Sequence, residues 1–392
     1  DGDEIQNIVL LEDDTITGLG SDISNGSTFV TLAVRDSILF AGGDINGTID
    51  ETDIRGLVTY DLESKSFNSQ PPSVSGANAT VAAIAVRPGD SGDVYVGGSF
   101  DDAGALSCPG LCTYNINSGQ WSRPGSELEG TVYSLLWLSK NQLVAGGDIR
   151  SNGSYLVSWD ANSETWSNFP GSEDIPGPVA VITPASSDYD QLWVAGTSLE
   201  DDSVFIMKYD GDQWHTVKPS LTSDTIIRGL QVFSVTEDHE DADLLDKNQV
   251  LMLTGSIGIP DFGDASAAIF NGTTYQPYAM TMKAGDGPGT IAGIFSQRDN
   301  FFKEGEFTLL SYFTKWAVLT ICLEKHMALG FVVLIGLAIA LGLMLLLVLC
   351  GIILDRIRKK REGYAPAPTS MYGRGSGMQR IPPHELLESL GH

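Results

Sequence analysis

A glycine-centred segment recurs five times along the 392 residues. In one copy, "LVAGGDIRSNGSYLVSWDANSETWSNFPG" (Leu143–Gly171), an apolar run ends in a Gly pair, a second ends in Trp-Asp, and another Trp follows. The glycines that align between copies lie 55, 49, 50 and 59 residues apart, at Gly42, Gly97, Gly146, Gly196 and Gly255. A period near 50 residues predicts an array of similar supersecondary units.

Each unit divides into four short runs. In the third unit they are Thr131–Leu138, 141–148, 154–160 and 164–169. Runs rich in β-branched and aromatic residues, separated by Gly, Asn, Asp and Ser, indicate strands and turns. The first run has counterparts in the other units at Ser27–Val34, Ala79–Val86, Gly177–Pro184 and Thr225–Val235.

Four-stranded units of this length, with a Gly pair and downstream aromatics, are typical of kelch-type β-propellers. Glycine suits inner strands that approach closely near the ring axis, and the Trp and Tyr side chains would pack blade against blade. An all-β sandwich is the alternative, but five units in one order favour the propeller. We therefore predict an all-β, kelch-like propeller ectodomain of about five or six four-stranded blades over residues 1–300.

The two ends of the ring are ambiguous in the sequence. Gly289–Ser296 ("GTIAGIFS") looks like the opening run of a further unit. The fifth unit could close the ring with strands from the chain start, or the ring could need preceding sequence. Because the chain opens "DGDEIQ" with neither an initiator Met nor a signal peptide, we expect a processed product or the C-terminal piece of a longer protein.

Met327–Leu354 is a run of 28 residues without a charge. About 20 apolar residues suffice to span a bilayer, so this run is expected to be a transmembrane helix. A basic membrane collar follows at Arg356, Arg358, Lys359, Lys360 and Arg361. The positive-inside rule places this collar in the cytosol. A glycolipid-anchor signal is not expected, because its hydrophobic tail would end the chain.

Charge divides at the same point. The chain has 23 Lys and Arg against 50 Asp and Glu, and the residues after Leu354 contain seven of the cations and four of the acids. The part before the span is therefore strongly acidic. This argues against nucleic-acid binding, because phosphates need cations. The balance fits a soluble ectodomain and identifies no ligand.

Five N-x-[ST] sequons, all before the span, are candidate glycosylation sites: Asn25, Asn46, Asn78, Asn152 and Asn271. Four of them are Asn-Gly-Ser or Asn-Gly-Thr, which also suit turns. Their shared placement on the expected lumenal side supports glycan attachment at most of them.

The cysteines divide by compartment. Cys108 and Cys112 lie in "CPGLC" and are expected to form a disulfide in an oxidising compartment, with a redox pair or half of a metal site as alternatives. Cys350, near the cytosolic end of the span, is a candidate for palmitoylation or a packed membrane thiol. Cys322 has no assignment.

Phe301–His326 is expected to supply closing strands and a membrane-proximal stalk. Within it, Phe307–Leu323 carries a single charge, Lys315, and could be a second span. The ectodomain and tail would then share one side of the membrane, which the sequons and the basic collar argue against.

No residue pattern indicates catalysis, and the fold does not decide the question. A kelch-type copper oxidase would need several His and Tyr ligands, and only His215, His239 and His326 precede the span. His215 reads as a surface or blade residue, and His239 lies in an acidic insertion expected to be a solvated loop. The stretch 43–53 resembles a calcium loop but lacks the EF-hand spacing and terminal Glu, although a structural calcium is an alternative there. We expect no catalytic residue and no cofactor.

The tail, 355–392, is rich in Pro, Gly and Ser and is expected to be disordered. Near its end, Leu386, Leu387 and Leu390 follow a Pro-Pro pair with a spacing that could fold on a partner. An unstructured end is the alternative, and the basic collar could simply hold anionic headgroups.

The Gly-Gly units, "CPGLCTYNINSGQWSRPG", "VVLIGLAIALGL" and "RIPP…LLESL" together resemble the C-terminal part of a fungal cortical marker family. These are the bipolar bud-site selection, or polarised-growth landmark, proteins of the Rax type. The similarity extends from the early repeats to the tail, but Phe301–His326 fits the family pattern poorly. Family members are long single-pass glycoproteins with propeller-like ectodomains, which agrees with a C-terminal piece.

The resemblance implies a type I marker at the plasma membrane of the division site, bud neck or growing tip. It also implies a multi-spanning membrane landmark partner and a Ras-like GTPase polarity module reached through the tail. A cell-wall polysaccharide is a candidate partner outside. No catalytic residues are carried over. The alternatives are a membrane-tethered carbohydrate-active enzyme, a kelch-type oxidase or an adhesion receptor.

Overall fold

The computed structural model describes residues 8–12, 15–18, 22–89, 91–149, 153–218, 220–235, 238–240, 242–282 and 289–293. The chain divides into two units, Asp1–His326 and Met327–His392, and every described residue belongs to the first. Those residues are mostly β-strands, as the short apolar runs predict. The expected stalk, span and tail lie outside the described residues.

Five antiparallel sheets of four strands form the main body, and each corresponds to one sequence repeat. We name them blades I to V. Blade I contains β3 (Thr28–Arg35), β4 (Ile38–Ile49), β5 (Thr52–Asp61) and β6 (Ser66–Phe67). Blade II contains β8 (Thr80–Val86), β9 (Asp93–Ser99), β12 (Leu111–Asn115) and β13 (Gln120–Ser122). The all-β, propeller part of the predicted fold is thereby confirmed.

The remaining blades follow in chain order. Blade III contains β14 (Gly130–Trp137), β15 (Gln142–Ile149), β16 (Leu156–Asp160) and β17 (Thr165–Asn168). Blade IV contains β18 (Val179–Pro184), β19 (Leu192–Thr197), β20 (Val204–Tyr209) and β21 (Trp214–Thr216). Blade V contains β22 (Ile226–Ser234), β23 (Gln249–Ile259), β24 (Gly263–Phe270) and β25 (Tyr275–Ala279).

Smaller elements accompany the blades. A hairpin of β1 (Val9–Glu12) and β2 (Thr15–Gly18) precedes blade I. A three-stranded sheet joins β7 (Val74–Ser75), β10 (Asp102–Ala103) and β11 (Leu106–Ser107), so it links the connection between blades I and II to a loop of blade II. A short 3-10 helix, η2 (Ser172–Asp174), lies between blades III and IV.

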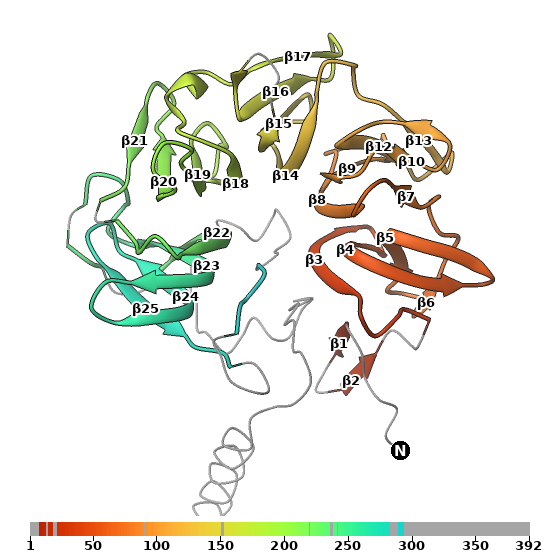
Figure 1. Cartoon of the computed structure of the whole chain (residues 1–392), viewed down its shortest axis with the longest axis horizontal. Coiled ribbons are helices and arrows are strands. Elements are labelled where there is room, and N and C mark those ends of the chain that lie inside the picture. The colour runs from red at the N-terminus through yellow and green to blue at the C-terminus, as the bar shows by residue number, and fades with distance from the viewer. Residues whose placement is uncertain are drawn as a thin grey trace, which may run out of the picture. The chain divides into compact units, whose positions relative to one another are not determined.

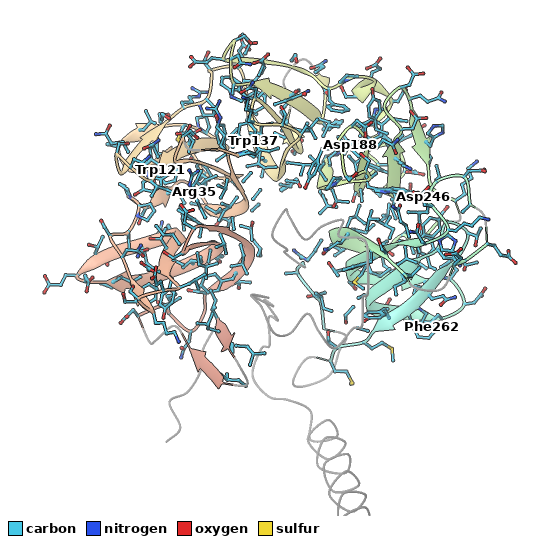
Figure 2. All side chains as sticks on the ribbon, turned by 180° about the vertical axis from the view of Figure 1, so that it is seen from behind. Arg35, Trp121, Trp137, Asp188, Asp246 and Phe262 are labelled. Carbon is cyan, nitrogen blue, oxygen red and sulfur yellow. A yellow bond between two sulfur atoms is a disulfide. The ribbon has the colours of Figure 1, made fainter. Side chains whose placement is uncertain are left out.

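The five blades succeed one another around a common centre, with the first strand of each blade toward that centre (Figure 1). Consecutive first strands contact each other from β3 through β8, β14 and β18 to β22. Figure 2 shows this ring from behind, with side chains filling the spaces between neighbouring sheets. Trp137 is one of them, and its ring meets Tyr95 of blade II edge-on at a centroid distance of 5.0 Å. The fold is therefore a propeller and not the β-sandwich that was the alternative.

Every blade closes its outer hairpin in the same way. An aromatic residue at the end of the third strand pairs in register with an aromatic residue of the fourth strand, at centroid distances of 4.8–5.3 Å. These pairs are Tyr60–Phe67, Tyr114–Trp121, Trp159–Trp166, Tyr209–Trp214 and Phe270–Tyr275.

The residue after the first aromatic of each pair is always Asp or Asn. Its side-chain oxygen accepts backbone N–H groups two and three residues further on, which is an Asx turn. The five turn residues are Asp61, Asn115, Asp160, Asp210 and Asn271. The Trp-Asp dipeptide of the third repeat is therefore one form of a hairpin signal present in all five.

The glycines of the repeat occupy two structurally different positions beside a β-bulge. In blade III, Gly147 pairs with Val132 and Gly146 pairs with Ser134, on either side of the bulge. A Cβ on Gly147 would overlap the backbone oxygen of Thr131, whereas a Cβ on Gly146 would meet Val179 of the next blade at 2.8 Å. Glycine is needed at the first position because a backbone group cannot move aside.

The sequence alignment of the glycines was wrong in the last two blades. Gly196 pairs with Val179 and Gly255 pairs with Ile227, so both match Gly147 rather than Gly146. The position of Gly146 is taken by Ala195 and Thr254. The error is one residue, because periodicity alone does not show on which side of a bulge a glycine lies.

Three indole N–H groups link blades to the connections that precede them. Trp121 Nε1 donates to Pro72 O at 3.0 Å, Trp166 Nε1 to Pro124 O at 2.8 Å, and Trp214 Nε1 to Pro170 O at 3.1 Å. Each Trp also belongs to the aromatic pair of its own hairpin, so it joins two neighbouring units. The predicted role of these Trp residues in packing between blades is confirmed.

Two segments singled out in the sequence have clear places in the fold. The stretch 43–53 is the end of a long β4–β5 hairpin whose turn, Asp50-Glu51, has positive φ at both residues. The acidic insertion around His239 is a loop whose described residues are mostly exposed or half-buried, as predicted, although Leu245 is buried and Lys208 donates to Leu244 O at 3.0 Å.

Candidate interaction surfaces

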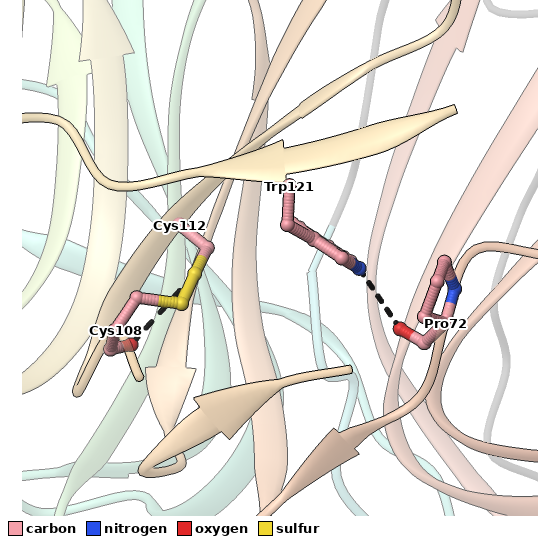
Figure 3. Close-up of a disulfide and its surroundings, with 4 residues drawn as sticks. All are labelled: Pro72, Cys108, Cys112 and Trp121. Carbon is pink, nitrogen blue, oxygen red and sulfur yellow. Dashed lines mark hydrogen bonds between the residues drawn. A yellow bond between two sulfur atoms is a disulfide. The ribbon is translucent and has the colours of Figure 1, made fainter. Parts of the chain in front are cut away.

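The predicted cysteine pair forms a disulfide in blade II (Figure 3). Cys112 lies within β12 and Cys108 directly follows β11, with their Cα atoms 5.8 Å apart. Both side chains are completely buried. The bond therefore ties the small β7–β10–β11 sheet to the third strand of the blade, and its burial fits a structural role better than a redox one.

Two of the predicted glycosylation sites are neighbours on blade I. Asn25 and Asn46 are both exposed. Ser27, the hydroxyl residue of the first sequon, donates to Asn46 O and accepts from Asn46 N, each at 3.0 Å. These bonds hold the segment before β3 against the β4–β5 hairpin. Glycans on both residues would cover one area of that blade.

The other sequons lie apart from this pair. Asn78 is exposed, with φ of 58°, just before β8. Asn271 is half-buried, and its Oδ1 accepts the N–H groups of Thr273 and Thr274 at 3.1 and 2.8 Å. This bonding leaves its Nδ2, the atom that carries a glycan, outside the turn. Asn152 lies outside the described residues.

A cavity of about 240 Å³ lies between the outer strands of blades IV and V. Its apolar floor includes the buried residues Phe205, Ile206 and Val217. Glu200 and Asp201 stand exposed at its rim, and Tyr275 of β25 lines it from blade V. None of the described residues that line this cavity is Lys or Arg. No local pattern in the sequence indicates this cavity, because its walls come from segments up to 99 residues apart.

The electrostatics of the cavity suit a neutral ligand. Hydrogen bonding from the Ser203 hydroxyl holds the pKa of the Asp201 carboxyl below its usual range, so that group is a carboxylate acceptor at neutral pH. Burial raises the pKa of the Tyr275 phenol, which therefore stays protonated. Carboxylates, hydroxyls and an aromatic ring can bind polyhydroxylated molecules, whereas a site without cations repels anions.

The two histidines of the described residues bond locally. His215 Nε2 lies 2.7 Å from Asp210 Oδ2 at the β20–β21 hairpin, and His239 contacts the backbone oxygens of Glu240 and Gln249. They belong to different neighbourhoods. Within the described ranges no three His, Cys, Asp or Glu side chains gather as a metal site.

The membrane-related predictions fall on other parts of the chain. Cys350, the collar Arg356–Arg361 and the anchors Leu386, Leu387 and Leu390 all lie outside the described residues. No helix among the described residues has the length and apolarity needed to cross a membrane. The span at Met327–Leu354 therefore remains a sequence-based prediction.

Residues 57–306 match the family model described as the Rax2 C-terminal beta propeller domain. The matched region is more than half of the chain and includes the end of blade I and all of blades II to V. The chain belongs to the Rax2 family. The resemblance noted in the Gly-Gly units and the "CPGLC" segment is thus confirmed.

Curated relatives extend this match. Polarized growth protein L1 of Phoma sp. is 40% identical over 402 residues, covering 100% of this chain and 29% of that protein. Polarized growth protein RAX2 of Candida albicans is 27% identical, covering 71% of this chain and 22% of its own length. Bud site selection protein RAX2 of Saccharomyces cerevisiae is 23% identical, covering 93% and 30%. The chain thus spans less than a third of these relatives, and none of the three is named as an enzyme.

Among solved structures, Kuenenia stuttgartiensis hydrazine synthase aligns with a TM-score of 0.41 at 10% identity, covering 65% of this chain and 70% of that chain. This likeness is too low to bear on function.

Proposed function

We propose that this Rax2-family chain is the C-terminal part of a non-enzymatic landmark for polarised growth or division-site selection. The observation that carries the proposal is the similarity to L1 of Phoma sp., a named polarized growth protein, along the whole of this chain. In this proposal the propeller lies outside the plasma membrane and the tail lies in the cytosol. Multi-spanning landmark and GTPase-module partners follow from the same proposal.

The location of a C-terminal fluorescent fusion through the division cycle tests the landmark role. Persistent rings or patches at old division sites or growing tips are expected. A uniform surface signal would instead favour the adhesion receptor or the membrane-tethered enzyme.

Sidedness is tested separately on intact cells. The sequons and the basic collar support a propeller outside the plasma membrane. Protease added to intact cells should therefore remove the propeller, and glycosidase should increase its gel mobility. A protected propeller with unchanged mobility would contradict this topology even if the fusion were polarised.

The tail is proposed to recruit the polarity machinery through Leu386, Leu387 and Leu390. Replacing the three by Ala should mislocalise polarity factors while the marker itself stays at the membrane, because the span and collar are untouched. A matched variant with Glu388 and Ser389 replaced by Ala keeps the apolar anchors and should leave polarity unchanged. Equal behaviour of the two variants would remove the leucines from the proposal.

For the outside partner, the cavity between blades IV and V favours a neutral polysaccharide over an anionic polymer. Titration of the protein with neutral glucan and chitin oligosaccharides tests this. Leu221→Trp, inside the cavity, should abolish any binding, whereas Leu199→Trp, an exposed residue that does not line the cavity, should preserve it. Binding that survives Leu221→Trp would place the polysaccharide site elsewhere.

A further inference from the structure

The first strand of each blade presents a pair of apolar residues, spaced i and i+3, to the blade before it. In blade III these residues are Val132 and Leu135, which approach the Gly97 position of blade II. In blade IV they are Val179 and Ile182, which approach Gly146. The same pair exists in the other blades as Val81 and Ile84, Ile227 and Leu230, and Phe29 and Leu32.

Blade I has this pair although none of blades II to V precedes it. Its Phe29 and Leu32 are buried, and they share a core cluster with Ile8 and Leu10 at the start of the described chain. The β1–β2 segment therefore occupies the place of a preceding blade. In blade III, Leu156 lies three residues before Trp159, which pairs with Trp166 on the fourth strand. In the first hairpin, Ile8 likewise lies three residues before Leu11, which pairs with Ile16. By this register β1 and β2 match third and fourth strands.

Blade V has the opposite deficiency, since no complete blade follows it among the described residues. Thr254 occupies the position of Gly146 there, and Ala267 pairs with it as Leu156 pairs with Gly146. Both residues are almost fully buried. Gly289 N donates to Thr281 O at 2.7 Å, and the buried Ser266 hydroxyl donates to Gly289 O at 2.9 Å. These bonds bring 289–293 to the side of blade V.

The sequence of that segment continues the pattern. "GTIAG" (289–293) aligns with "GTVYS" (130–134) at the start of β14, which places Ile291 at the position of Val132. In Figure 1 the segment lies on the central side of the ring, past β22, while β1 and β2 lie farther out beside blade I. The two segments thus lie beside blade V and beside blade I, which are the two ends of the row of five blades.

We propose that residues 289–293 and the β1–β2 hairpin belong to one sixth blade, which closes the ring between blades V and I. Residues 289–293 take the innermost strand position, and β1 and β2 take the two outer positions. The two ends of the propeller are then held in one sheet, so neither end can open without loosening the other. This closure is independent of the proposed landmark function.

Native-state hydrogen exchange of the full chain, followed by mass spectrometry, tests the shared blade, because segments of one cooperative unit open together. Leu10→Ala removes a buried contact to blade I. Val9→Ala, on the same strand, alters a side chain that is 38% exposed. Leu10→Ala should increase exchange at least about tenfold in both 8–18 and 289–293, whereas Val9→Ala should change neither segment appreciably.

The reciprocal variant Ile291→Val should increase exchange in the β1–β2 hairpin, and it is mild enough to preserve folding if Leu10→Ala does not. Leu10→Val can replace Leu10→Ala for the same reason. Faster exchange confined to the mutated segment, in either direction, would show that the two ends pack independently and would overturn the sixth blade.

Discussion

The blades differ in the aromatic residue that the fourth strand contributes to the hairpin pair. In blades II, III and IV it is a Trp whose indole N–H reaches a Pro carbonyl in the preceding connection. In blades I and V the same place is taken by Phe67 and Tyr275. All five residues still form the aromatic pair of their own hairpin, so the hairpin does not require Trp.

Only the Trp residues donate an indole N–H to the preceding connection, so the indole adds a link between blades that Phe67 and Tyr275 do not make. Phe67 has no donor, and Tyr275 lines the cavity between blades IV and V instead of bonding like the three Trp residues. The cavity therefore lies at the described blade junction where the Trp–Pro link is replaced. The Trp–Pro link is therefore kept at the junctions of blades I–II, II–III and III–IV and is absent at the junction of blades IV and V, where the cavity lies.

The largest effect is expected from the glycine that all five blades share. Gly147→Ala would force a Cβ into the backbone oxygen of Thr131, and we expect a loss of about 3 kcal/mol or more in the free energy of unfolding. Chemical denaturation measures it. Gly26→Ala, where no atom lies within 4 Å of the new Cβ, should cost less than about 0.5 kcal/mol. Similar costs at both positions would contradict the requirement for glycine at the Gly147 position.

The second largest effect is expected from the disulfide, which distinguishes blade II from the other blades. Replacing Cys108 and Cys112 by Ser should cost about 2 kcal/mol from the added freedom of the unfolded chain, by the loop-entropy relation. Urea unfolding with and without reductant gives the measurement. Reductant should lower the midpoint of the wild type but not of the variant, and an equal response would mean that the bond does not form.

Much of this comparison is visible in the sequence. The four runs of the third unit predict β14 to β17 to within two residues, because Gly, Asn and Asp mark their turns. The Cys108–Cys112 pair was predictable because its five-residue loop leaves little choice of partner. Both predictions depend on local sequence.

Features that depend on register or distant contacts were not predictable. The glycine alignment failed at Gly196 and Gly255 because a bulge shifts pairing by one residue without changing the pattern. The cavity depends on Tyr275 meeting blade IV, and nothing local to Tyr275 specifies an empty space. Within the mostly exposed insertion around His239, the burial of Leu245 also depends on contacts with distant residues.

The contribution of the Trp–Pro link is expected to be smaller than that of the disulfide. Trp166→Phe removes the bond to Pro124 O, and Trp137→Phe removes an indole whose Nε1 has no hydrogen-bond partner among the described residues. Both Trp residues are buried, so the lost volume is matched. Trp166→Phe should be about 1 kcal/mol more destabilising in chemical denaturation. Equal losses would mean that the indole acts by packing alone.

The smallest effect concerns the Asx turns, where blades I, III and IV have Asp and blades II and V have Asn. Backbone N–H groups, chiefly those of Ser64 and Gln213, hold the pKa of the Asp61 and Asp210 carboxyls below the ordinary 3.8, and His215 adds to the effect at Asp210. A lowered folded-state pKa gives stability that is present above pH 3.8 and is lost as the pH falls through the folded value.

Replacing both Asp61 and Asp210 by Asn keeps the acceptor oxygen in each turn and removes the titration of the carboxyl group. The melting temperature of this variant should therefore fall less steeply below about pH 4 than that of the wild type. Asn115→Asp should have the opposite effect and steepen the fall, and parallel curves for all three proteins would show that these turns do not contribute to acid sensitivity.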